Sequence, residues 1–159
     1  MKRTPLARKS PLKAKKPLKR SNTKARTEKP AKRQKKPSVR LLKKKLWKLC
    51  REIAFEIYAH ECYTCGTYLQ RGSSIMQLGH FLPKSTCSAE LAFDMKNLRW
   101  QCRYCNQFKS GEWVKFEQRL IAEHGQEYVD ELKRRDLATR GKQYDTLWYQ
   151  NKIAEYSIM

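Results

Sequence analysis

Hydrophobic residues recur with helical spacing in the first apolar stretch of the chain, residues 38–60. Within SVRLLKKKLWKLCREIAFEIYAH, leucine and isoleucine advance by three and four positions, while lysine and arginine fall mainly on the other side. This spacing predicts one long amphipathic helix, and Ser38, directly after Pro37, is its candidate N-cap. The apolar stripe of that helix is Leu42, Leu46, Leu49, Ile53 and Ile57.

Two shorter runs have the composition of strands. SIMQLGHFL, residues 74–82, is apolar and β-forming until Pro83, and NLRWQC, residues 97–102, is a second short strand. A helix follows, for which Ser110 is the candidate N-cap and Gly125 the C-terminal stop. The order strand, loop, strand, helix predicts a small α+β core.

Two further helical segments close the chain, QEYVDELKRRD and YDTLWYQNKIAEY. The fold class expected is therefore α+β, with a small metal-bound core flanked by helices. The predicted organisation is a basic tail over residues 1–37, a long amphipathic helix over 38–61, a zinc-clipped core over 62–124 and C-terminal helices over 125–159.

Charge is concentrated in the tail. Residues 1–40 hold 17 Lys and Arg against one acid, which accounts for +16 of the formal net charge of +21, and five of the six prolines lie in residues 1–37. Such a segment is expected to be disordered and to bind a polyanion, most simply nucleic acid. We interpret it as a DNA-contacting arm; a solubilising or localising tail is the alternative.

No stretch is apolar enough to span a membrane, and the N-terminus lacks the apolar core of a signal peptide, so we expect an intracellular protein without a membrane partner. Six cysteines in such a protein are more often metal ligands or plain thiols than disulfides. Four of them form two C-x-x-C pairs, and Cys50 and Cys87 remain outside.

The pairs are Cys62 with Cys65 and Cys102 with Cys105. Two C-x-x-C turns can complete a tetrahedral four-cysteine site, so the spacing predicts a structural Zn²⁺ ion, and Gly66 suits the tight turn after the first pair. Such a site is closed and holds the fold together without being a catalytic centre. Unrelated thiols, or a redox pair without its usual βαβ context, are the alternatives.

His80 lies in the 36 residues between the two pairs. An isolated histidine in an apolar run is more often a core residue, but here Asn97 opens the second strand and Asn106 follows the last cysteine. A catalytic base is therefore an open alternative for His80, because a neutral imidazole can accept a proton from water near physiological pH. His60 and His124 have weaker contexts and are interpreted as structural.

The pattern C-x-x-C, G-H, N-L, C-x-x-C-N resembles HNH, or ββα-metal, endonucleases with a zinc clip. LGHF, FDMKNLRWQCRYCNQFKSG and RLIAEHGQEYVDEL are more closely similar to the phage lambda NinG (Rap) recombination-protein family, over roughly residues 62–135. The Cys-Asn end also resembles phage endonuclease VII. The resemblance implies a DNA endonuclease that acts on branched recombination intermediates, such as Holliday junctions or D-loops, in the host cytoplasm.

The resemblance also implies residue roles. His80 takes the place of the general base, Asn97 ties the loop between the strands to the hairpin, and Asn106 is a ligand of a catalytic Mg²⁺ or Mn²⁺ ion. Gly79 differs from the wider HNH pattern, which has a metal-binding Asp or His there, although NinG-like proteins also read Gly-His. Asp94 is the candidate for the missing metal ligand or for a residue that orients such a ligand, with a turn-capping role as the alternative.

Several basic residues are candidate DNA contacts. Lys109 and Arg99 are near the predicted site in sequence, and Lys43 and Lys44 fall on the outer face of the long helix. Solvated side chains are the alternative for all four. Trp100 is expected in the core, with base stacking as the open alternative.

Three functions are compatible with these features. The leading hypothesis is a metal-dependent endonuclease that cuts one strand per active site, so that two cuts at a junction would call for a homodimer, with the helix over 38–60 as candidate interface. A non-catalytic zinc-ribbon DNA-binding protein is the alternative, which Gly79 favours. An RNA-binding or ribosome-associated protein is allowed by charge alone.

Overall fold

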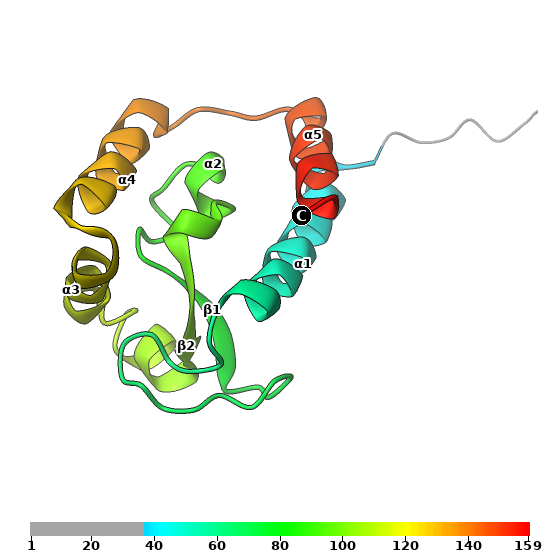
Figure 1. Cartoon of the computed structure of the whole chain (residues 1–159). Coiled ribbons are helices and arrows are strands. Elements are labelled where there is room, and N and C mark those ends of the chain that lie inside the picture. The colour runs from blue at the N-terminus through cyan, green and yellow to red at the C-terminus, as the bar shows by residue number, and fades with distance from the viewer. Residues whose placement is uncertain (1–36) are drawn as a thin grey trace, which may run out of the picture. The chain divides into compact units, whose positions relative to one another are not determined.

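The computed structural model describes residues 37–159, so the predicted tail over residues 1–36 lies outside the described residues. Helices and one small antiparallel sheet follow one another as predicted, which confirms the α+β class (Figure 1). No helix within 37–159 is long and apolar enough to cross a membrane. The elements are α1 (Val39–Ile57), β1 (Met76–His80), α2 (Ala89–Ala92), the 3₁₀ turn η1 (Met95–Asn97), β2 (Leu98–Cys102), the π-helical turn η2 (Tyr104–Phe108), α3 (Trp113–His124), α4 (Gln126–Thr139) and α5 (Thr146–Ser157).

The predicted long helix is confirmed as α1. It begins after Ser38, whose carbonyl accepts hydrogen bonds from the amides of Leu41 and Leu42, although the Ser38 side chain makes no capping bond. The helix ends at Ile57, because Tyr58 is extended, and Ile57 is exposed rather than part of the stripe. The buried side of α1 is Leu42, Leu46, Cys50, Ile53 and Ala54.

The two strands pair antiparallel, with Met76 opposite Cys102 and His80 opposite Leu98. This register places His80 and Cys102 at opposite ends of the sheet. β1 is shorter than the predicted 74–82. The connection between the strands contains α2 and η1, which the sequence did not reveal because elements of three and four residues have no detectable periodicity.

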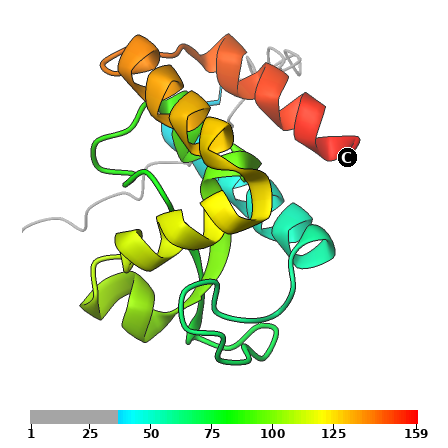
Figure 2. The same ribbon diagram turned by 60° about the vertical axis from the view of Figure 1, so that its left-hand side comes forward.

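Two packed clusters lie on either side of the sheet. α1 packs against α5 and β2, while α3 packs against α4. The sheet accordingly lies between these two helix pairs in Figure 1, and Figure 2 shows the turned view. Trp100 is buried in the first cluster and its Nε1 donates to the carbonyl of Ala54 at 3.0 Å, so its indole is a core residue and cannot stack on a base.

The start of α3 differs from the prediction and its end agrees with it. Ser110 is not the N-cap: it has φ +51° and lies in the turn that closes η2, and α3 begins after Glu112, which also has φ +51°. Gly125, at φ +84°, ends the helix as predicted. α4 then runs on to Thr139, past the predicted segment.

Asn97 ties the loop after β1 to the start of β2. Its side chain is fully buried; Oδ1 accepts from the amide of Leu82 at 2.7 Å, and Nδ2 donates to the carbonyls of Leu82 and Leu91 at 3.2 and 3.0 Å. These are the contacts that the family resemblance implies. Asn97 therefore acts on the fold and does not face a pocket.

We expect Asn97→Ala to lower the free energy of unfolding by about 2–4 kcal/mol, because three hydrogen bonds are lost and buried backbone groups stay unpaired. Denaturant unfolding followed by circular dichroism measures the change. Asn106→Ala, at a half-buried asparagine with one side-chain bond, is the matched control and should cost less than about 1 kcal/mol. Equal losses for the two variants would contradict the tether.

Candidate functional site

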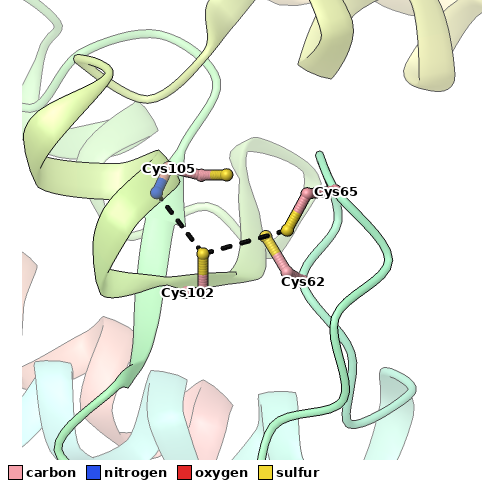
Figure 3. A group of neighbouring side chains, drawn as sticks. All are labelled: Cys62, Cys65, Cys102 and Cys105. Atoms are coloured by element: carbon pink, nitrogen blue, oxygen red, sulfur yellow. Dashed lines mark hydrogen bonds between the residues drawn. The ribbon is translucent and has the colours of Figure 1, made fainter.

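The four paired cysteines converge on one point. The two pairs come from different segments, and Figure 3 shows their side chains gathered around a common centre. Their Sγ atoms all lie within 4.8 Å of one another, and those of Cys65 and Cys102 are 3.9 Å apart. Zn–S bonds of about 2.3 Å put the sulfurs of a tetrahedron roughly 3.8 Å apart. The cluster can therefore hold a structural metal such as zinc.

Hydrogen-bond donors beside the cluster can stabilise negative charge on these sulfur atoms. The hydroxyls of Thr64 and Thr67 lie 3.4 and 3.2 Å from the Sγ atoms of Cys62 and Cys65. The amide of Cys105 donates to Sγ of Cys102 at 3.4 Å. Hydrogen bonds of this kind orient metal ligands and stabilise thiolates.

The remaining two cysteines, Cys50 and Cys87, lie outside the cluster and pack in or against the hydrophobic core. Cys50 is buried and donates a weak hydrogen bond to the carbonyl of Phe93, and burial raises the pKa of its thiol to about 12. Burial likewise raises the pKa of the Cys87 thiol to about 11. High pKa values keep both groups as unreactive thiols at neutral pH.

His80 is held in a defined orientation at the end of β1. Its Nε2 lies 3.0 Å from the carbonyl oxygen of Ala92, and its ring stacks on Trp47 of α1 with centroids 5.4 Å apart and an angle of 4°. Burial lowers the pKa of His80 to about 4, and the nearby Lys84 adds to this effect. The imidazole is therefore neutral at pH 7. Because a carbonyl only accepts, Nε2 carries the proton and Nδ1 the lone pair.

His80 and Asn106 share one pocket. It has a volume of about 480 Å³ and lies between the end of β1, η2 and α3. Nδ2 of Asn106 donates to Oε1 of Gln77 at 2.8 Å, so its Oδ1 is the atom that can face a cation. Glu117 and Lys133 also line the pocket and form an ion pair with each other. The pocket thus combines an imidazole, an amide oxygen, a carboxylate and a lysine.

Comparison with known proteins identifies the family. The family model described as Bacteriophage Lambda NinG protein matches residues 1–157. The chain belongs to the NinG family. Protein ninG of Escherichia phage 933W is 41% identical over 73 residues, those of Escherichia phage lambda and Salmonella phage P22 are 40% and 38% identical over the same length, and each match covers 45% of this chain. The match spans about a third of each relative, 33–34% of its length. No solved structure matches the chain.

In this NinG-family chain, side-chain packing explains why the residue before His80 is a glycine. A Cβ at Gly79 would lie 2.0 Å from Oε1 of Gln101, whose side chain is fully buried. Gln101 is held there because its Nε2 donates to the carbonyl of Gly111 at 2.7 Å and to the hydroxyl of Thr64 at 3.3 Å. The space beside His80 on this strand is therefore occupied.

Asp94 does not lie in the His80 pocket, which corrects its assignment as a metal ligand. Oδ1 accepts from the amide of Lys96 at 2.8 Å and caps η1, and Oδ2 pairs with Arg135 at 2.7 Å. Asp94 lines a separate hollow with α4 and α5. The turn-capping alternative is the one observed. The carboxylate that lines the His80 pocket is that of Glu117 in α3.

Arg99 is also corrected, because it is buried and cannot contact DNA as a surface residue. Its guanidinium lies over the ring of Tyr58 at 4.4 Å and donates to Nε2 of His124 at 3.1 Å. His124 is thereby structural, as expected. His60 lies beyond the end of α1, with Nε2 3.3 Å from the carbonyl of Phe55 in the last helical turn, which agrees with a structural role.

Other predicted basic residues do lie beside the pocket. Lys43 and Lys44 line an adjoining hollow with Trp47 and Lys84, and Lys84 also lines the His80 pocket. Lys109 is exposed after η2 and pairs with Glu112 at 3.1 Å. Trp47, Glu117 and Lys133 were not predicted as site residues, since they come from three helices that are far from His80 in sequence. Lys84 lies only four residues after His80 and was not distinguished from the other surface lysines.

For the cysteine cluster, we expect about one zinc per chain in native protein. Cys105→Ser should weaken metal binding at least 100-fold or so, because a thiolate ligand is replaced by a poor one. Elemental analysis and chelator competition measure this. Cys87→Ser, outside the cluster, should keep the full metal content. Native protein without bound zinc, or equal metal loss in both variants, would contradict the site.

For His80, we expect Trp47→Ala to raise the imidazole pKa from about 4 toward the ordinary 6.5. Removing the stacked indole admits water, which favours the charged imidazolium. Titration of the His80 ring protons by nuclear magnetic resonance measures the shift. Trp47→Phe preserves an aromatic face and should leave the pKa near the wild-type value. An unchanged pKa in Trp47→Ala would show that burial by the indole is not its cause.

Proposed function

We propose that this chain is a metal-dependent DNA endonuclease of the HNH, or ββα-metal, type that cuts branched recombination intermediates. The observation that carries the proposal is the shared pocket of His80 on β1 and Asn106 on η2. The order β1, β2, η2, with Asn97 tying the hairpin, is what the resemblance to HNH enzymes leads us to expect. Membership in the NinG family supports the same reading.

His80 acts as the general base in this proposal. Its Nε2–H donates to Ala92, so the lone pair of Nδ1 accepts a proton from a water molecule. The water oxygen bonds to phosphorus as the bond from phosphorus to the 3′-oxygen breaks. The negative charge of a bound phosphate would raise the low pKa of His80, which brings its basicity closer to neutral pH.

Asn106 and Glu117 would hold the divalent metal. Both line the His80 pocket, and their amide and carboxylate oxygens are donors that Mg²⁺ and Mn²⁺ accept, with water completing the shell. The ion neutralises charge on the phosphate and the leaving oxygen when it is bound. Lys133 pairs with Glu117 and holds a positive charge at the same pocket. Lys84, on its rim, is placed to contact a phosphate.

Zinc in the four-cysteine cluster has a structural part in this proposal, because four thiolates leave no open coordination position. DNA would lie across the His80 pocket and the adjoining hollow lined by Lys43, Lys44 and Lys84, and the charge of residues 1–40 would add affinity. Cleavage of both strands at a junction would require two chains. The apolar side of α1 is buried within its own chain, so a dimer through α1 would use the outer face.

A non-catalytic DNA-binding protein is the second candidate. It is favoured by Gly79, where the wider HNH pattern has a metal ligand and where the Gln101 side chain leaves no room for one. The two candidates share the fold, the zinc cluster and the basic rim. They differ in whether DNA bound at the pocket is cut.

We expect Mg²⁺- or Mn²⁺-dependent nicking of a four-way DNA junction, reduced about 10²–10⁴-fold in His80→Ala, because the general base is lost. Denaturing electrophoresis of end-labelled junctions measures the rate. His60→Ala is the matched control, a half-buried histidine outside the pocket, and should retain activity within about threefold. Junction binding without nicking would sink the enzyme proposal and leave the DNA-binding candidate.

A further inference from the structure

The turn η2 exposes two aromatic rings beside the candidate active site. Tyr104 is 60% and Phe108 69% exposed, although large apolar rings at a surface are unfavourable unless something covers them. The same turn buries Cys105 in the thiol cluster and presents Asn106 to the His80 pocket. The inward side of η2 therefore carries Cys105 and Asn106. The exposed rings of Tyr104 and Phe108 have no part in the proposed cleavage chemistry.

The two rings form one surface. Their centroids are 6.2 Å apart and their planes differ by 30°, because the π-helical turn brings residues 104 and 108 to the same side. Trp113, also 60% exposed, follows at the start of α3 and lines the His80 pocket. Exposed aromatic side chains thus extend from η2 to the rim of the pocket.

Cations accompany the rings. The guanidinium of Arg103 lies 5.8 Å from the ring centre of Phe108, and Nζ of Lys109 lies 5.3 Å from that of Tyr104. Aromatic faces bordered by Lys and Arg are the combination with which proteins bind nucleic-acid bases that are not paired, since the ring stacks on the base and the cation meets the phosphate. A base inside a duplex is already stacked on both faces and does not offer this contact.

We propose that Tyr104 and Phe108 form a stacking platform for an unpaired DNA base next to the His80 pocket. The proposal deepens the proposed function and rests on it for the nature of the substrate. Branched DNA has unpaired or easily unstacked bases at the branch point, whereas continuous duplex does not. Tyr104 and Phe108 flank Asn106 by two residues on either side, so a base held by the rings binds at the same short turn that lines the pocket.

The test compares a short fluorescent oligothymidylate with a duplex of the same length, by anisotropy, on the full-length zinc-loaded chain without added divalent metal. The double variant Tyr104→Ala/Phe108→Ala should bind the oligothymidylate about tenfold more weakly and the duplex within about twofold of wild type. Equal losses on both DNAs, or an unchanged affinity for the oligothymidylate, would overturn the platform.

Matched variants separate stacking from charge. Tyr68→Ala removes another exposed aromatic side chain and should leave both affinities unchanged. Tyr104→Phe keeps the ring and should retain binding, while Arg103→Gln should weaken both DNAs and reduce the salt dependence. A loss in Tyr68→Ala as large as in the double variant would overturn the assignment to η2.

The same assay keeps the two proposals distinguishable. His80→Ala should reduce nicking of a junction about 10²–10⁴-fold and leave oligothymidylate binding intact, because the platform does not use the imidazole. If wild-type protein binds the oligothymidylate through Tyr104 and Phe108 but never nicks, the platform stands and the endonuclease falls. If it nicks a junction and the double variant loses no preference for the oligothymidylate over duplex, the platform falls alone.

Discussion

The convergence of four cysteines is the constraint on which the rest of the fold depends. The sheet has two strands of five residues each, and a two-stranded hairpin is at best marginally stable alone. Cys102 is the last residue of β2, and the first cysteine pair is joined to the same strand where the amide of Tyr63 donates to the carbonyl of Trp100. A metal in the cluster would therefore hold β2 and the following turn η2 together. The position of Asn106 in η2 would then depend on the metal-bound cysteines.

His80 shows how the flanking helices act on the site. Its ring is neutral because it is buried, with Trp47 of α1 over one face; the hydrogen bond to the Ala92 carbonyl of α2 raises the pKa of His80 but does not outweigh burial. Folding holds a histidine neutral that would titrate near 6.5 in the unfolded chain, so stability is lost as pH falls from that value toward 4. The helix outside the small core thus sets the protonation state of a residue inside it.

The sequence predicted the features that rest on local rules: the extent of the long helix to within a few residues, the glycine stop at Gly125 and the convergent C-x-x-C pairs. The tether role of Asn97 came from the family resemblance, and its hydrogen bonds agree with it. It failed where a partner comes from a distant segment. Asp94 was assigned to a metal, yet Arg135 of α4 holds it, and Arg99 was assigned to DNA, yet the rings and carbonyls around it bury it. Spacing along the chain cannot reveal which charge meets which across two helix layers.

The buried side chain of Gln101 explains why residue 79 is a glycine. The cross-strand neighbour Arg99 points into the packing, and Gln101 fills the volume beside Gly79 while tying the turn before α3 through Gly111. A larger side chain at residue 79 would displace Gln101 and release that turn, on which the start of α3 depends. In the proposed endonuclease, a carboxylate ligand for the divalent ion would therefore come from another element, and Glu117 of α3 lines the pocket.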